Sequence, residues 1–225
     1  MTFSILGWCP VTNQFGVAVT TSSIAVGARC PHARAGVGAV STQNITDPRL
    51  APAILDIMAR GASPDEAIDA IVDGCPHADY RQLAVIGADG QSAVHSGAKT
   101  LGTHATAARA RCVAAGNLLS GEHVMDAIAD GFMANKDTYL ADHLVAGLEA
   151  GLQAGGEEGP VHSAALLVVE QHDFPLIDLR VDWSDGDPVQ ELARLWADYT
   201  PHMRDYETRA LNPSAAPSYG VPGDL

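Results

Sequence analysis

The order of strand-like and helix-like stretches constrains this fold more than any other feature of the sequence. Strand patterns occur in groups, and pairs of helices separate the groups along the chain. Strand-like runs cover residues 3–8, 14–21, 35–43, 81–88, 91–95, 110–115, 164–169 and 176–181, and helical periodicity covers 47–61, 63–72, 122–135, 139–154 and 187–199. Such grouping favours antiparallel sheets with helices on their outer faces over repeated parallel β-α-β units. We therefore predict an α+β fold, a four-layer αββα sandwich of two antiparallel sheets flanked by helices.

Cap residues mark the starts of the predicted helices. Asp47-Pro48 and Asp187-Pro188 each place a capping side chain before a proline suited to the first helical position, and Ser63 with Glu66 forms a capping box. We predict one domain over residues 1–200. Residues 201–225 are predicted to form an extended C-terminal tail, either disordered or lying on a partner subunit. Apolar helical faces and this tail are compatible with a homodimer.

The beginning of the chain carries the clearest chemical candidate. Thr2 directly follows Met1 and precedes the first predicted strand. If Met1 is removed, Thr2 holds a hydroxyl nucleophile and an α-amine of near-neutral pKa on one α-carbon, so the amine can take the hydroxyl proton. No G-x-S-x-G motif offers a competing nucleophile. Because Met-Thr also begins many ordinary proteins, a terminus without catalytic role is the alternative.

Four further polar residues stand at the ends of predicted strands. Asn117 can donate a hydrogen bond to an oxyanion, or it can belong to a strand-to-helix turn. Ser23 returns to the start of the first strand through the predicted hairpin, where it either lines a site or caps the backbone. Gln43 can orient a substrate carbonyl or form a turn. Arg81 can bind a substrate carboxylate or pair with a structural aspartate.

The charge of the chain excludes several function classes. The net charge is −14, with 27 acidic and 13 basic residues, which argues against binding nucleic acid or an anionic membrane. The first basic residue is Arg29, and no apolar run reaches about 18 residues, so we expect neither a signal peptide nor a membrane span. The expected location is the cytoplasm. Without a phosphate loop, zinc-helix motif or nucleotide fingerprint, no cofactor is expected, and the expected partner is a small-molecule substrate.

The cysteines offer one metal-based alternative. Cys30-Pro31-His32-Ala33 recurs as Cys75-Pro76-His77-Ala78, and the two Cys-x-His pairs could supply four zinc ligands. This spacing differs from the usual one, in which two to four residues separate paired cysteines. We therefore predict reduced thiols and no metal site.

Several short motifs, in order along about residues 1 to 200, carry a resemblance to a known family. They are Met1-Thr2-Phe3-Ser4-Ile5, Pro10-x-Thr12, Gly16-Val17-Ala18-Val19, Thr42-Gln43, Gly61-x-Ser63-x-x-Glu66-Ala67, Arg81-Gln82, Gly116-Asn117-Leu118-Leu119, Ala154-Gly155-Gly156, Ser163-Ala164-Ala165-Leu166 and Asp178-Leu179-Arg180-Val181-Asp182. With them the chain resembles the domain-of-unknown-function 1028 family of bacteria, whose fold is similar to that of the N-terminal nucleophile (Ntn) hydrolases. The resemblance implies an αββα sandwich with Thr2 at the nucleophile position and hydrolysis of a C–N amide bond in a small molecule.

Three positions depart from the family pattern. Cys9 stands where relatives carry Asp after the first strand, and Asn13 replaces a turn glycine, which is tolerable because Asn adopts positive φ. The segment from Glu157 to Ser163 lacks the arginine expected before the late strand. His162 could offer a new polar contact to a substrate there, or it could be structural.

These features lead to two functional hypotheses. In the first, the protein is an N-terminal-threonine amidohydrolase in which Thr2 is the nucleophile, its amine is the general base and Asn117 is the oxyanion donor. Ser23, Gln43, Arg81 and His162 would line the substrate site. In the alternative, the protein keeps Met1 and binds a small molecule without catalysis.

Overall fold

The computed structural model describes residues 2–135 and 139–218. A six-stranded antiparallel sheet has the strand order β10-β9-β2-β1-β8-β7, so the first hairpin lies at its centre. Its strands are β1 (Thr2–Cys9), β2 (Gln14–Thr21), β7 (Ala105–Arg109), β8 (Cys112–Asn117), β9 (Ser163–Val169) and β10 (Ile177–Val181). A four-stranded antiparallel sheet has the order β3-β4-β5-β6. Its strands are β3 (Pro31–Arg34), β4 (Gly38–Asn44), β5 (Arg81–Gly87) and β6 (Ser92–Ser96).

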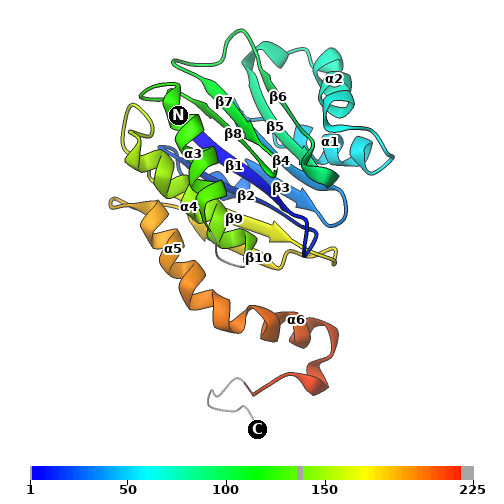
Figure 1. Ribbon diagram of the computed structural model, residues 1–225. Coiled ribbons are helices and arrows are strands. Elements are labelled where there is room, and N and C mark those ends of the chain that lie inside the picture. Colours follow the sequence, from blue (N-terminus) through cyan, green and yellow to red (C-terminus); the bar gives the residue numbers. More distant parts are fainter. Residues whose placement is uncertain (1, 136–138, 219–225) are drawn as a thin grey trace.

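Helices cover the outer face of each sheet (Figure 1). Helices α3 (His123–Ala134), α4 (Leu140–Gln153) and α5 (Pro188–Tyr199) pack on the larger sheet, and α1 (Leu50–Met58) and α2 (Pro64–Gly74) pack on the smaller one. Short 3-10 helices occur at Val26–Ala28, Ala78–Tyr80, Ala88–Gly90, Thr200–His202 and Pro213–Ala215. The predicted α+β architecture of four layers, αββα, is confirmed. Among the described residues, no helix combines the length and the apolar character needed to cross a membrane.

The alternation of side chains along β1 distributes them between two cores. Phe3 and Ile5 are fully buried against the helices, and each contributes roughly 1.5–3 kcal/mol through burial. Leu6 and Trp8 point the other way, into the apolar layer between the sheets. By the same alternation, the side chain of Thr2 faces the second sheet.

Several predicted boundaries are wrong. Helix α1 begins at Leu50, because the Asp47 carboxylate accepts a hydrogen bond from the Arg49 backbone and the intervening residues form a turn. Asn117 is the last residue of β8, where we predicted a strand-to-helix turn. The short strands β3 and β7 were missed, since alanines and polar residues leave them without a clear apolar alternation.

The predicted extended tail is also wrong over part of its length. Residues Met203–Leu211 form helix α6, which follows the 3-10 turn at Pro201. Arg204 pairs with Glu207 one turn along this helix and with Glu170 in the body of the protein. These ion pairs and the burial of Met203 fix the helix to the domain, and neither is visible as an apolar periodicity.

Candidate active site

Four polar side chains form one row across the larger sheet. Thr2 pairs with Thr21 on one side and with Asn117 on the other, and Thr21 in turn pairs with Ser163. Register partners point to the same face of a sheet, so all four side chains face the smaller sheet. All four are buried, with Thr2 only 6% exposed. We call this set the polar row.

A chain of hydroxyl groups leads from Thr2 to a cation. The Thr2 and Thr21 Oγ1 atoms lie 3.1 Å apart, and Thr21 Oγ1 lies 3.2 Å from Ser23 Oγ. The Arg29 guanidinium donates a hydrogen bond of 2.8 Å to Ser23 Oγ and two more to the carbonyls of Ile24 and Ala25. Among the described residues, Arg29 forms no ion pair with a carboxylate. The guanidinium therefore keeps its charge available beside the polar row.

Two glutamines join the sheets behind the polar row. Gln43 Nε2 donates to Gln82 Oε1 (2.8 Å) and to the Ala115 carbonyl (2.9 Å), while its Oε1 accepts from Ser4 and Ser41. Gln82 Nε2 donates to the Gly116 carbonyl and to Ser96. Both side chains are fully buried, and both amides use all their hydrogen-bonding capacity. Gln43 thus braces the two sheets and has no donor left for a substrate.

Asn117 is only partly satisfied in this network. Its Nδ2 donates to Gln82 Oε1 at 3.0 Å, which leaves one N–H. Its Oδ1 is buried and has no hydrogen-bond partner among the described residues. A buried acceptor in this state costs about 1–3 kcal/mol, and native structures rarely tolerate it without another partner. The side chain therefore still offers one donor and one acceptor beside Thr2.

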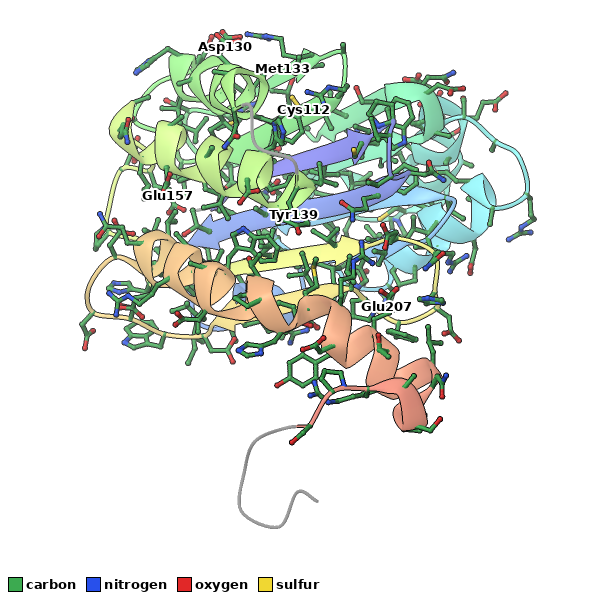
Figure 2. All side chains as sticks on the ribbon, turned by 60° about the horizontal axis from the view of Figure 1, so that its bottom comes forward. Cys112, Asp130, Met133, Tyr139, Glu157 and Glu207 are labelled. Carbon is green, nitrogen blue, oxygen red and sulfur yellow. The ribbon has the colours of Figure 1, made fainter. Side chains whose placement is uncertain are left out.

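Glu157 is a buried carboxyl at the same edge of the sheet, in the loop between α4 and β9 (Figure 2). It is 6% exposed, and its backbone forms a β-bridge with Leu119, just beyond β8. Neither carboxyl oxygen has a hydrogen-bond partner of good geometry in residues 2–135 and 139–218. Burial raises the pKa of Glu157 to about 8, although the positive charge of the chain's α-amine and, to a smaller extent, the backbone N–H of Ser22 lower it in part.

The structure brings four of the six candidate residues together. Thr2 and Asn117 are neighbours in the polar row, Gln43 lies behind it, and Ser23 joins it through Thr21. The other two, Arg81 and His162, have side chains engaged in contacts outside the polar row.

Arg81 is engaged with the segment after β4. Its guanidinium donates to the Ile45 carbonyl and lies 3.9 Å from the Asp47 carboxylate. Hydrogen bonds from Arg49, assisted by the charge of Arg81, lower the pKa of Asp47 to about 2. Of the two roles considered for Arg81, pairing with a structural aspartate is the one that these contacts match.

His162 contacts the polar row through its backbone alone. Its backbone N–H donates to the Thr21 carbonyl at 2.8 Å. The ring lies 2.8 Å from the Ser184 carbonyl through Nδ1 and stacks on Trp183 with the centroids 4.4 Å apart. These contacts match the structural role.

The described residues contain no group of three or more His, Cys, Asp or Glu side chains placed to hold a metal ion. The two Cys-Pro-His segments therefore do not form one centre: Cys30 and His32 lie at β3, and Cys75 ends α2. All four cysteines are free thiols, as predicted.

Sequence reasoning missed Thr21, Arg29, Gln82 and Glu157. Thr21 could have been found by counting, since two eight-residue strands joined by a four-residue turn pair the first residue with the last. Gln82 could have been found by pairing its predicted strand with the predicted strand that contains Gln43. Arg29 and Glu157 carried no local signal, because loops bring them to the site.

Comparisons with known proteins identify the family. A crystal structure of a DUF1028 protein from Silicibacter pomeroyi superposes with a TM-score of 0.82 at 28% identity, covering 88% of this chain and 89% of that one. Anbu (ancestral beta-subunit) from Yersinia bercovieri gives a TM-score of 0.40 at 11% identity, covering 91% of this chain and 97% of that one. No curated protein gives a significant match. The family of unknown function DUF1028 matches residues 2–192, and the chain belongs to that family.

Proposed function

We propose that this protein is an N-terminal-threonine amidohydrolase that cleaves a C–N amide bond in a small molecule. The observation that carries the proposal is the position of Thr2. It is the first residue of a central strand, and its hydroxyl lies in a buried polar row between two sheets. Cleavage of the peptide bond before Thr2 would create an α-amine on the same residue as this hydroxyl.

The mechanism follows from these groups. The Thr2 amine takes the proton of the Thr2 hydroxyl, and Oγ1 attacks the substrate carbonyl carbon. The tetrahedral intermediate collapses when the leaving amine receives that proton, which leaves an acyl ester on Thr2. Water then attacks the ester, gives up a proton to the α-amine, and releases the carboxylic acid with the threonine restored.

Asn117 fits the role of oxyanion donor in this scheme. One of its Nδ2 hydrogens is committed to Gln82, and the other has no partner among the described residues. A preorganised donor of this kind stabilises a transition state by about 3 kcal/mol. The hydrogen bond to Gln82 would fix the orientation of the Asn117 amide while its second N–H donates to the developing oxyanion.

Arg29 leads us to include a carboxylate in the proposed substrate. Arg81, the cation considered first, is occupied by Asp47, whereas Arg29 lies at the end of the hydroxyl chain that starts at Thr2. A guanidinium without a carboxylate partner is suited to bind one from a ligand. The proposed substrate is a small amide that bears a carboxylate several bonds from the scissile carbonyl.

The test combines a measurement of intact mass with an assay of turnover. The untagged protein is produced in its native host, weighed by mass spectrometry, and assayed for ammonia or amine release from small amides with and without a carboxylate. We expect loss of Met1 and turnover that falls at least 10³-fold in Thr2→Ala, with part retained in Thr2→Ser. Complete retention of Met1, together with no turnover, would favour the alternative of a non-catalytic small-molecule binder.

A further inference from the structure

Buried oxygen atoms without hydrogen-bond partners lie beside and beyond the first residue of β1. They are both carboxyl oxygens of Glu157 and Oδ1 of Asn117, and none has a partner of good geometry among the described residues. Both residues are more than nine-tenths buried. Since native proteins rarely bury acceptors without donors, these atoms indicate a donor group that the described residues do not supply.

The position of Glu157 shows where that donor belongs. Strand β1 lies between β2 and β8, and the chain continues past Thr2 on both sides, through Ser22 and through Leu119. The backbone of Glu157 bridges to Leu119, and its carboxyl lies near the Ser22 N–H. Adjacent strands are about 4.8 Å apart, so the carboxyl lies close to the N-terminal end of β1.

The loop that carries Glu157 is held firmly in this position. Gly155 and Gly156 adopt positive φ of 114° and 56°, which ends α4 with a reversal of the chain. The Gly156 carbonyl then accepts from the Ser120 N–H at 3.0 Å, and the Glu158 N–H donates to the Leu118 carbonyl at 3.0 Å. The carboxyl of Glu157 is therefore fixed at the sheet edge and cannot easily turn toward solvent.

We propose that the Glu157 carboxyl and Asn117 Oδ1 together form a receptor for the α-amine of Thr2 after the peptide bond before Thr2 is cleaved. An α-amine carries up to three N–H donors at the end of β1, where Asn117 lies beside Thr2 and the Glu157 carboxyl lies beyond it. The inference rests on the exposure of this amine in the proposed function, and it does not require turnover. Glu157 is a positioning residue, since it acts on the reaction through the amine.

The electrostatics agree with this assignment. Burial is the main cause of the raised pKa of Glu157, and the positive charge of the chain's α-amine lowers this pKa in part. An ammonium group beside the carboxyl would lower the pKa of Glu157 again. The carboxylate would in turn raise the proton affinity of the amine. The two groups would then titrate as a coupled pair near neutral pH, where a general base is most effective.

The experiment measures the proton affinity of the Thr2 amine without any substrate. Protein that begins at Thr2 is prepared by proteolytic removal of a fused N-terminal domain, with 13C-labelled threonine incorporated. The Cα and Cβ shifts of Thr2 are then followed by NMR against pH in the unmodified protein, in Glu157→Gln, and in the matched control Glu158→Gln. Glu158 is adjacent in sequence but exposed.

We expect the Thr2 amine of Glu157→Gln to bind its proton at least tenfold more weakly than the amine of the unmodified protein. The amine of Glu158→Gln should have the same proton affinity as that of the unmodified protein. Equal proton affinity in folded Glu157→Gln and unmodified protein would overturn the proposal.

If Glu157→Gln does not fold, the carboxyl of Glu157 is titrated by 13C-glutamate NMR in unmutated protein with and without Met1. Its pKa should fall by at least one unit when Thr2 is first, and an unchanged pKa would count against the receptor. Absent turnover together with a Glu157-dependent amine would refute the proposed function alone.

Discussion

The hydroxyl oxygens of Thr2 and Thr21 lie 3.1 Å apart, because these two residues are direct register partners across the central hairpin. The relationship is fixed by the hairpin itself, since a shift of one residue would turn both side chains to the opposite face. In the proposed reaction the Thr21 hydroxyl orients the Thr2 hydroxyl toward its base. The polar row also continues to Ser163 and Asn117, so a change at Thr21 alters the polar contacts beside the nucleophile.

Replacement of Thr21 by valine tests this relationship. Valine keeps the branched shape and removes the hydroxyl, so we expect the fold to persist and kcat to fall about tenfold, as for one lost hydrogen bond of about 1–1.5 kcal/mol. Thr106→Val, at an exposed position of β7, is the control and should leave kcat unchanged. Circular dichroism with steady-state kinetics provides the measurement. An unaltered kcat in Thr21→Val would remove Thr21 from the mechanism.

Gln82 should be the most sensitive residue of the network between the sheets. Gln82→Leu leaves the Asn117 amide, the Gln43 amide and the Gly116 carbonyl each short of one buried partner. We expect a decrease of about 2–4 kcal/mol in the free energy of unfolding. Urea denaturation of Gln82→Leu beside Gln91→Leu, whose side chain is exposed, checks this value. A loss below about 0.5 kcal/mol would show that the amides find other partners.

Glu157 should make stability depend on pH in the protein that keeps Met1. Its folded-state pKa is raised from 4.5 to about 8, so the folded protein holds a proton that the unfolded chain releases. Stability is then unaffected by Glu157 below about pH 4.5, falls as the pH rises toward 8, and stays reduced above it. Glu157→Gln lacks this penalty and should gain a few kcal/mol relative to unmutated protein between pH 5 and pH 8. Thermal or urea unfolding at several pH values measures the difference, and parallel pH profiles for the two proteins would contradict it.

The sequence predicted the architecture well because its signals are local. Caps at Ser63 and Asp187 and the turn that joins the first two strands act within a few residues, and the structure shows each of them. The polar site was predicted only in part, since its geometry depends on contacts between distant segments. The sequence predicts a turn at Asn117, because nothing in its own segment reveals the pairing with Thr2.

The loop residues show most clearly which features of the site the sequence does not predict. Glu157 follows a glycine pair that reads as an ordinary helix end, and its burial arises only when residues 155–158 pair with residues 118–120. Arg29 lies after a left-handed residue, Ala25, which turns the chain so that the guanidinium returns to Ser23. The conformation of the Arg29 loop does not follow from residue preferences, because alanine rarely adopts positive φ. Only the packed structure reveals these two groups.

Arg29 provides a test of the proposed substrate class. Arg29→Met keeps the apolar stem of the side chain and removes its charge, so we expect KM for a carboxylate-bearing amide to rise at least tenfold with little change in kcat. For the matching neutral amide, both constants should stay close to those of unmutated protein, because the lost interaction is with the carboxylate. Arg34→Met controls for the change in net charge, since Arg34 pairs with Asp56 at the surface. Equal effects of Arg29→Met on the two substrates would assign Arg29 to the structure of the 22–29 loop, where it donates to two carbonyls, and would leave the substrate without a carboxylate requirement.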